Sequence, residues 1–163
     1  MKKQITKEEA LGKLESLCSR SEQCEYDLMQ KLYRWGLPAP QRSEIIESLK
    51  ENRFLDNGRY AKSYAHDKAR FSAWGPMKIR MELIKKRINS QLISEALRGI
   101  DQEIWREGIF KNARAKAKSL DLKGENSFQE KQKLIRYLVG RGYPVAAAVK
   151  AAKALEARGE IDS

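Results

Sequence analysis

The sequence contains very little of the side-chain chemistry on which metal sites and redox centres depend. Its 163 residues include one histidine, His66, and two cysteines, Cys18 and Cys24. A structural zinc site needs four nitrogen or sulfur ligands at paired spacings, so this set excludes one. Cys18 occupies an apolar position of a helical pattern, and both thiols are expected to be reduced. No metal and no other cofactor is predicted.

Long apolar runs and targeting signals are also missing. The longest apolar run, residues 145–149, is far shorter than the roughly 20 residues that span a bilayer as a helix. Lys2 and Lys3 stand near the N-terminus, but no apolar stretch follows them as it does in a signal peptide. We therefore expect a soluble, cytoplasmic protein without a membrane partner.

The sequence contains no catalytic motif. Glycine-rich nucleotide loops, the His-Glu-x-x-His metal motif and the nucleophile elbow are all absent. Carboxylates such as Glu8, Glu9 and Asp67 are interpreted as surface charges or helix caps, because general acid catalysis requires a cleft that raises a pKa. We predict no catalytic residue and no enzymatic activity. An enzyme with unrecognised chemistry is the weakest alternative.

Positive charge, by contrast, is abundant. Lys and Arg number 33 against 22 Asp and Glu, which gives a net charge of +11. Such a surplus favours a polyanionic partner, whether nucleic acid, an anionic membrane surface or an acidic protein face. Residues 1–50, 51–100 and 101–163 carry net charges of +1, +6 and +4, so the surplus lies in the middle and last thirds.

The apolar residues recur at helical spacing along nearly the whole chain, and no strand pattern appears, so the predicted fold is all-α. Helices are predicted, in order, at about 7–19, 22–35 and 40–51, from Asp56 onward, at 76–87, from Ser90 onward, at 101–119, and twice more after a polar break. Ser21, Asp56 and Ser90 are the predicted N-caps.

An internal repeat organises these helices into three tandem three-helix units. The pattern of Leu28, Leu32 and Gly36 recurs after 51 residues and again after a further 55. The predicted units are 1–54, 55–99 and 100–163. Stacked units of this kind favour an elongated, curved array, with a compact nine-helix bundle as the alternative. No heptad seam suggests a dimer, so a monomer is expected.

The densest positive charge lies at residues 78–87. On a helical wheel Lys78, Lys85 and Lys86 share an arc opposite Leu83 and Ile84. Arg80 and Arg87 fall on the apolar side. Arg80 therefore either lays its stem along apolar surface or faces a partner. The neighbouring aromatic residues fit nucleic-acid stacking or, more simply, core packing: Tyr60, Tyr64, Phe71 and Trp74.

Residues 56–97 carry a recognisable pattern. It comprises Asp56, Arg59, Tyr60, Ala61, Tyr64, Arg70, Gly75, Pro76, Lys78, Ile79, Leu83, Lys86, Arg87, Ile88, Ile93, Ala96 and Leu97. This resembles the RecX regulatory-protein family, bacterial modulators of the RecA recombinase. Arg87 stands where the family usually has a glycine that ends the helix, whereas the first and third units have Gly36 and Gly142 there.

The resemblance implies a non-enzymatic protein that binds the RecA–DNA filament and limits its extension, ATP turnover and strand exchange. DNA, single- or double-stranded, is the second implied partner. The residues expected to contact RecA or DNA are Arg59, Arg70, Lys78, Arg80, Lys85, Lys86 and Arg87. The expected scaffold of the motif is Tyr60, Tyr64, Gly75, Ile79 and Leu83. The alternative is a sequence-independent DNA-binding or architectural protein without a recombinase partner.

Overall fold

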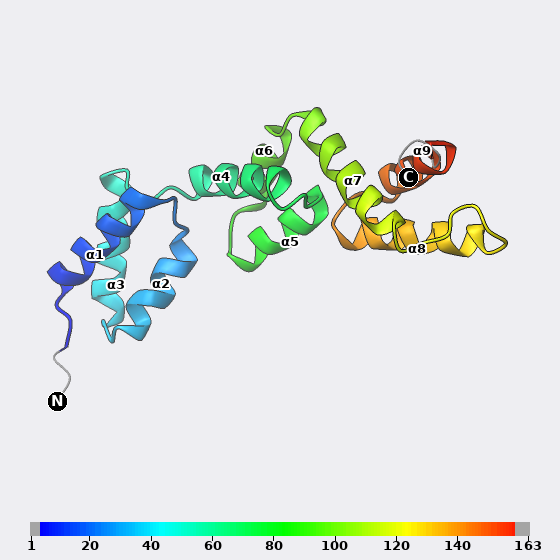
Figure 1. Ribbon diagram of the computed structural model, residues 1–163. Coiled ribbons are helices and arrows are strands. Elements are labelled where there is room, and N and C mark those ends of the chain that lie inside the picture. The colour runs from blue at the N-terminus through cyan, green and yellow to red at the C-terminus, as the bar shows by residue number, and fades with distance from the viewer. Residues whose placement is uncertain (1–3, 159–163) are drawn as a thin grey trace. The chain divides into compact units, whose positions relative to one another are not determined.

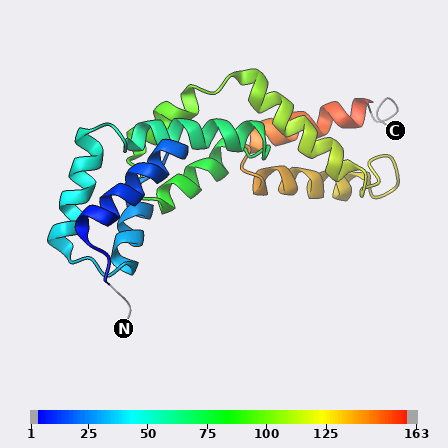
Figure 2. The same ribbon diagram turned by 60° about the vertical axis from the view of Figure 1, so that its left-hand side comes forward.

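The computed structural model describes residues 4–158, and within them the chain forms nine α-helices and no strand (Figures 1 and 2). The helices are α1 (Lys7–Arg20), α2 (Glu25–Arg34), α3 (Ala39–Glu51), α4 (Asn57–Arg70), α5 (Pro76–Lys85), α6 (Ser90–Arg98), α7 (Gln102–Ala117), α8 (Ser127–Gly140) and α9 (Val145–Arg158). The prediction of an all-α protein built from three-helix repeats is confirmed.

Packing divides these residues into two compact units. The first holds the described residues up to Ser63 together with Leu83–Ser94, and the second holds Tyr64–Glu82 together with the described residues from Glu95 onward. In the first unit α3 packs on α1 and α2, and in the second α7, α8 and α9 pack on one another. Helices α4, α5 and α6 are each divided between the units, and the repeat boundaries 1–54, 55–99 and 100–163 stay a prediction.

Equivalent helices contribute equivalent pairs of buried side chains. Each pair is four residues apart and fully buried: Leu28 and Leu32 on α2, Ile79 and Leu83 on α5, Leu134 and Leu138 on α8. Residues at this spacing lie on one face of a helix. Burying one such side chain contributes about 1.5–3 kcal/mol. The sequence repeat therefore corresponds to a repeated packing role.

The same three helices end in the same backbone turn. The φ angles just beyond them are 82° at Gly36, 60° at Arg87 and 104° at Gly142. The next residue's N–H then donates to a leucine carbonyl five positions back, at 3.2 Å in all three cases. This is the Schellman arrangement, which favours glycine at the left-handed position. Arg87 adopts the glycine conformation despite its Cβ.

Two helix starts differ from the prediction. Ser21 does not cap α2, which begins at Glu25, because the Asn57 side chain accepts the Glu25 N–H at 3.0 Å from a distant part of the chain. Ser90 is the first residue of α6 rather than its cap. The side chain of Asn89 accepts a first-turn N–H there at 2.8 Å.

A buried polar junction in the second unit joins the α4–α5 loop to α7 and to the α8–α9 turn. The Asn112 amide donates to the Ala73 carbonyl at 2.7 Å, and the Tyr143 hydroxyl donates to the same carbonyl at 2.9 Å. The Arg141 guanidinium donates to Asn112 Oδ1 at 3.0 Å and to the Ser72 carbonyl at 2.7 Å. Burial raises the pKa of the Tyr143 hydroxyl to about 12, so this group remains a donor at neutral pH.

Two glycine backbones touch beside this junction. The Gly75 N–H donates to the Arg141 carbonyl and the Met77 N–H to the Gly142 carbonyl, both at 2.8 Å. A Cβ added at Gly75 would lie 2.3 Å from the carbonyl carbon of Gly142, which is closer than non-bonded atoms approach. Position 75 therefore requires glycine, and the motif residues on either side of it are held in place.

Replacing Arg87 by glycine is expected to give a protein about 1 kcal/mol more stable than Arg87→Ala, because only glycine relieves the steric cost of a φ near 60°. Both substitutions remove the same guanidinium contact with the Tyr26 ring, so they differ in the backbone alone. Urea unfolding measures both. A glycine variant no more stable than the alanine variant would contradict the account of this turn.

Asn112→Leu is expected to cost about 2–4 kcal/mol of unfolding free energy, because it removes a buried amide and leaves the half-buried Arg141 guanidinium short of an acceptor. Asn52→Ala is the matched control: it removes an exposed amide bonded to the Ser48 carbonyl at 2.9 Å and should cost less than about 1 kcal/mol. Similar losses in the two variants would show that the junction is not a special contributor.

Candidate partner-binding surface

The seven predicted contact residues divide between the two units. Arg59, Lys85, Lys86 and Arg87 belong to the first unit, whereas Arg70, Lys78 and Arg80 belong to the second. The two sets have different surroundings.

Arg59 is held by its own chain. Its Nε donates to both carboxylate oxygens of Glu22 at 3.1 and 3.2 Å, and its Nη2 donates to the carbonyls of Arg53 and Phe54 at 2.8 and 3.3 Å. The prediction that Asp56 caps α4 is confirmed, since its side chain accepts the Arg59 N–H at 3.0 Å. The Arg59 side chain thus fastens the start of α4 to the first repeat, and we leave it out of the proposed surface.

Lys86 and Arg87 also face α2. The Lys86 ammonium donates to the Asp27 carboxylate at 2.9 and 3.1 Å, and the Arg87 guanidinium lies 5.7 Å from the centre of the Tyr26 ring. Lys85 is exposed. A Lys86→Glu variant would place two carboxylates, Glu and Asp27, beside each other. A loss of function in that variant could therefore come from the broken ion pair within the chain and not only from a lost contact with a partner.

The second unit gathers cations around one indole ring. The ammonium groups of Lys68 and Lys78 lie 4.8 and 4.5 Å from the centre of the Trp74 ring. Lys68 also lies 5.6 Å from the Tyr64 ring, which meets Trp74 edge to face with centres 6.5 Å apart. We name Tyr64, Lys68, Trp74 and Lys78 the Trp74 cluster.

The Trp74 cluster is suited to an anion. Neither Lys68 nor Lys78 has an ion pair with any residue from 4 to 158. Two ammonium groups within about 5 Å of one ring centre repel each other, and a phosphate or carboxylate that binds both would offset that repulsion. The rings hold the lysine stems, since a cation over an aromatic face gains about 0.5–1 kcal/mol at an exposed site.

Backbone contacts fix the geometry of the Trp74 cluster. The Trp74 N–H donates to the Lys68 carbonyl at 3.0 Å, which folds the loop back on the end of α4. Ala73 and Gly75, on either side of Trp74, are held by the polar junction. Lys68 was absent from the predicted set. The sequence signal that could have identified Lys68 is its position four residues after Tyr64 on a helix, which makes the two side chains neighbours.

Exposed apolar side chains lie in the same segment. Phe71, Met77 and Met81 are 71%, 55% and 57% exposed. Arg70 lies 5.9 Å from the centre of the Phe71 ring. The prediction that Ile84 belongs to the buried face of α5 is wrong: Ile84 is 49% exposed, because the face that packs inward carries Ile79 and Leu83.

The thiols are poor nucleophiles. Burial raises the pKa of Cys24 to about 11 and also raises the pKa of Cys18, so both are protonated near neutral pH. Within residues 4–158 no group of histidine, cysteine and acidic side chains could hold a metal ion. None of the helices in this range is long and apolar enough to cross a bilayer.

Known proteins of one family resemble this chain. A family description, "RecX, second three-helix domain", matches residues 56–97. A regulatory protein RecX of Clostridium perfringens (strain 13 / Type A) is 31% identical over 145 residues, covering 86% of this chain and 68% of that protein. A regulatory protein RecX of Vibrio campbellii is 31% identical over 127 residues, covering 78% and 79%.

Solved structures agree in fold. The crystal structure of a regulatory protein RecX superposes with a TM-score of 0.77 at 24% identity, covering 88% of this chain and 71% of that one. RecX from Lactobacillus salivarius gives 0.79 at 19% identity, covering 93% and 97%. On the identity and coverage of its sequence relatives, this chain belongs to the RecX family of regulatory proteins.

Proposed function

We propose that this chain is a non-enzymatic, monomeric, cytoplasmic inhibitor of the RecA recombinase. It binds the RecA–DNA filament and limits filament extension, ATP turnover and strand exchange, and it thereby modulates DNA repair and recombination. Membership of a family of regulatory proteins supports the regulatory part, and the resemblance of residues 56–97 supports RecA as the target.

The observation that carries the proposal is the composition of the segment from Tyr64 to Glu82. It combines the unpaired cations Lys68 and Lys78 with the exposed apolar side chains of Met77 and Met81. Exposed methionines one helical turn apart are adaptable contacts for another protein. Cations held over rings are suited to phosphates or carboxylates. A filament of protein on DNA offers both kinds of partner.

A second candidate is sequence-independent DNA binding without a recombinase. The net charge of +11 and the indole ring with two lysines close to it favour it, because single strands bind through phosphate contacts and stacking on aromatic rings. The exposed methionines have no evident use in that function.

Lys78→Glu is expected to weaken inhibition of RecA ATPase on single-stranded DNA by about tenfold or more, because it places a carboxylate where an anion should bind. The matched control is Lys13→Glu, which reverses a lysine 5.6 Å from the Trp35 ring in the first unit. The assay titrates each protein below the concentration of RecA. Equal inhibition by both variants would contradict a role for the Trp74 cluster.

Binding to bare single-stranded DNA separates the two candidates. If Lys78 contacts a phosphate, Lys78→Glu should flatten the slope of log affinity against log salt by about 0.7. If it contacts RecA, affinity for bare DNA should hardly change. Met77→Ala combined with Met81→Ala should reduce inhibition and leave DNA affinity unchanged. Unaltered inhibition by the methionine variant would favour the second candidate.

A further inference from the structure

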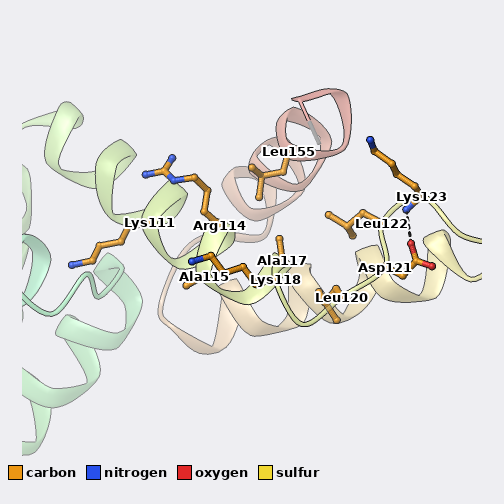
Figure 3. Close-up of a pocket in the computed structure, with 10 residues that line it drawn as sticks. All are labelled: Lys111, Arg114, Ala115, Ala117, Lys118, Leu120, Asp121, Leu122, Lys123 and Leu155. Carbon is orange, nitrogen blue, oxygen red and sulfur yellow. Dashed lines mark hydrogen bonds between the residues drawn. The ribbon is translucent and has the colours of Figure 1, made fainter. Parts of the chain in front are cut away.

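A second basic feature lies in the second unit, and it includes none of the seven residues expected from the sequence. It is a groove of about 720 Å³ beside α7, the loop that follows α7, and α9 (Figure 3). Its walls carry four cations above an apolar floor. The lining residues are Lys111, Arg114, Ala115, Ala117, Lys118, Leu120, Asp121, Leu122, Lys123 and Leu155.

Three of the cations form a row on α7 and its end. Lys111, Arg114 and Lys118 are spaced by three and four residues, which places them on one face over about 10 Å of helix axis. All three are exposed, and none of them has an ion pair with a residue that the structure describes. The row is therefore a ladder of positive charge without its own counter-ions.

The floor is an outer layer of a hydrophobic core. Ala117, Leu120 and Leu122 are half-buried and pack against the core cluster that includes Leu155. Figure 3 shows Leu122 on the loop and Leu155 on α9. These side chains leave apolar surface within reach of a ligand.

The loop that forms one wall is ordered by its own hydrogen bonds. Asp121 Oδ1 accepts the N–H groups of Lys123 and Gly124 at 3.2 and 2.9 Å. The first of these bonds is the dashed line in Figure 3. This turn keeps Leu120 and Leu122 beside α7, so the groove needs no rearrangement to form.

We propose that this groove binds an acidic amphipathic helix of a partner protein. Leucines spaced by three and four residues would enter the apolar floor. Glutamates or aspartates at the same spacing would face Lys111, Arg114 and Lys118 over the same 10 Å or so of axis. The positive charge of the groove walls requires a negatively charged partner, and the apolar floor requires that the partner helix also has an apolar face.

A nucleic-acid strand fits the groove less well. Sequence-independent binding of single strands uses aromatic side chains on which bases stack. None of the residues that line this groove is aromatic, and half of them are alanine or leucine. The indole ring that lies near Lys68 and Lys78 belongs to the separate Trp74 cluster.

The test uses the full chain and synthetic probes, with neither RecA nor ATP, so it is independent of the proposed function. A fluorescent helical peptide of roughly 15 residues carries leucines and glutamates at the stated spacing. One comparison peptide replaces the glutamates by glutamine, another replaces the leucines by serine, and an oligothymidylate of similar length is the nucleic-acid probe. Fluorescence anisotropy gives each affinity.

The Leu/Glu peptide should bind the unaltered chain about tenfold more tightly than either comparison peptide. Arg114→Glu with Lys118→Glu should reduce that affinity about tenfold or more. The matched control is Arg136→Glu with Lys153→Glu, which reverses one exposed arginine and one exposed lysine outside the groove and should leave the affinity unchanged. Circular dichroism verifies that both double variants remain helical.

Two outcomes would overturn the proposal. Loss of oligothymidylate binding in the groove variant, with peptide binding intact, would make the groove a nucleic-acid site. Equal peptide affinity in the groove variant, the control variant and the unaltered chain would show that these cations are ordinary surface charge.

Discussion

The contact between the backbones of Gly75 and Gly142 is the constraint on which the arrangement of the second unit depends. A Cβ at position 75 would overlap the carbonyl carbon of Gly142, so the two turns approach as closely as they do only because both residues are glycine. The approach permits the bonds from the Gly75 and Met77 N–H groups. Around it, Asn112, Tyr143 and Arg141 satisfy the buried carbonyls that it would otherwise leave unpaired.

The same constraint prepares the Trp74 cluster. Trp74 stands between Ala73, whose carbonyl accepts two buried donors, and Gly75, which is fixed against the α8–α9 turn. An indole ring on such a loop has little freedom to move away from Lys68 and Lys78. A rigid platform loses less conformational entropy when it binds a partner. The α7 groove is similarly preformed by the Asp121 turn.

Local sequence signals predicted most of the fold, but they did not predict which side chains bond to residues far away in the sequence. Helical spacing identified the helices, and the recurrence of Leu28 and Leu32 identified the repeat, because both depend on neighbours within one helix. Arg59 and Lys86 were expected from the sequence to contact RecA or DNA. In the structure they bind Glu22 and Asp27, which lie 37 and 59 residues away, and no local pattern indicates such a pair. The α2 cap was missed for the same reason, since Asn57 supplies it.

The location of a contact surface in the middle repeat stays a prediction, and the structure adds residues to it that the sequence did not indicate. Charge counting pointed to the middle repeat, and Lys78 with Trp74 lies there. The exposure of Met77 and Met81 depends on how α5 is rotated against its neighbours, which the sequence pattern of a short helix leaves open. The sequence pattern did not single out the cations of the α7 groove. The groove is formed only when the loop after α7 and α9 lie beside these residues in the fold.

Amide hydrogen exchange of the unaltered chain tests the central constraint most directly. If the Gly75 and Met77 N–H groups are bonded to the Arg141 and Gly142 carbonyls, both should exchange as slowly as the buried amides of α8, although they lie in a loop and in the first turn of a helix. Exchange at the rate of an unstructured peptide at these two positions would contradict the account, because the turns would then not be joined.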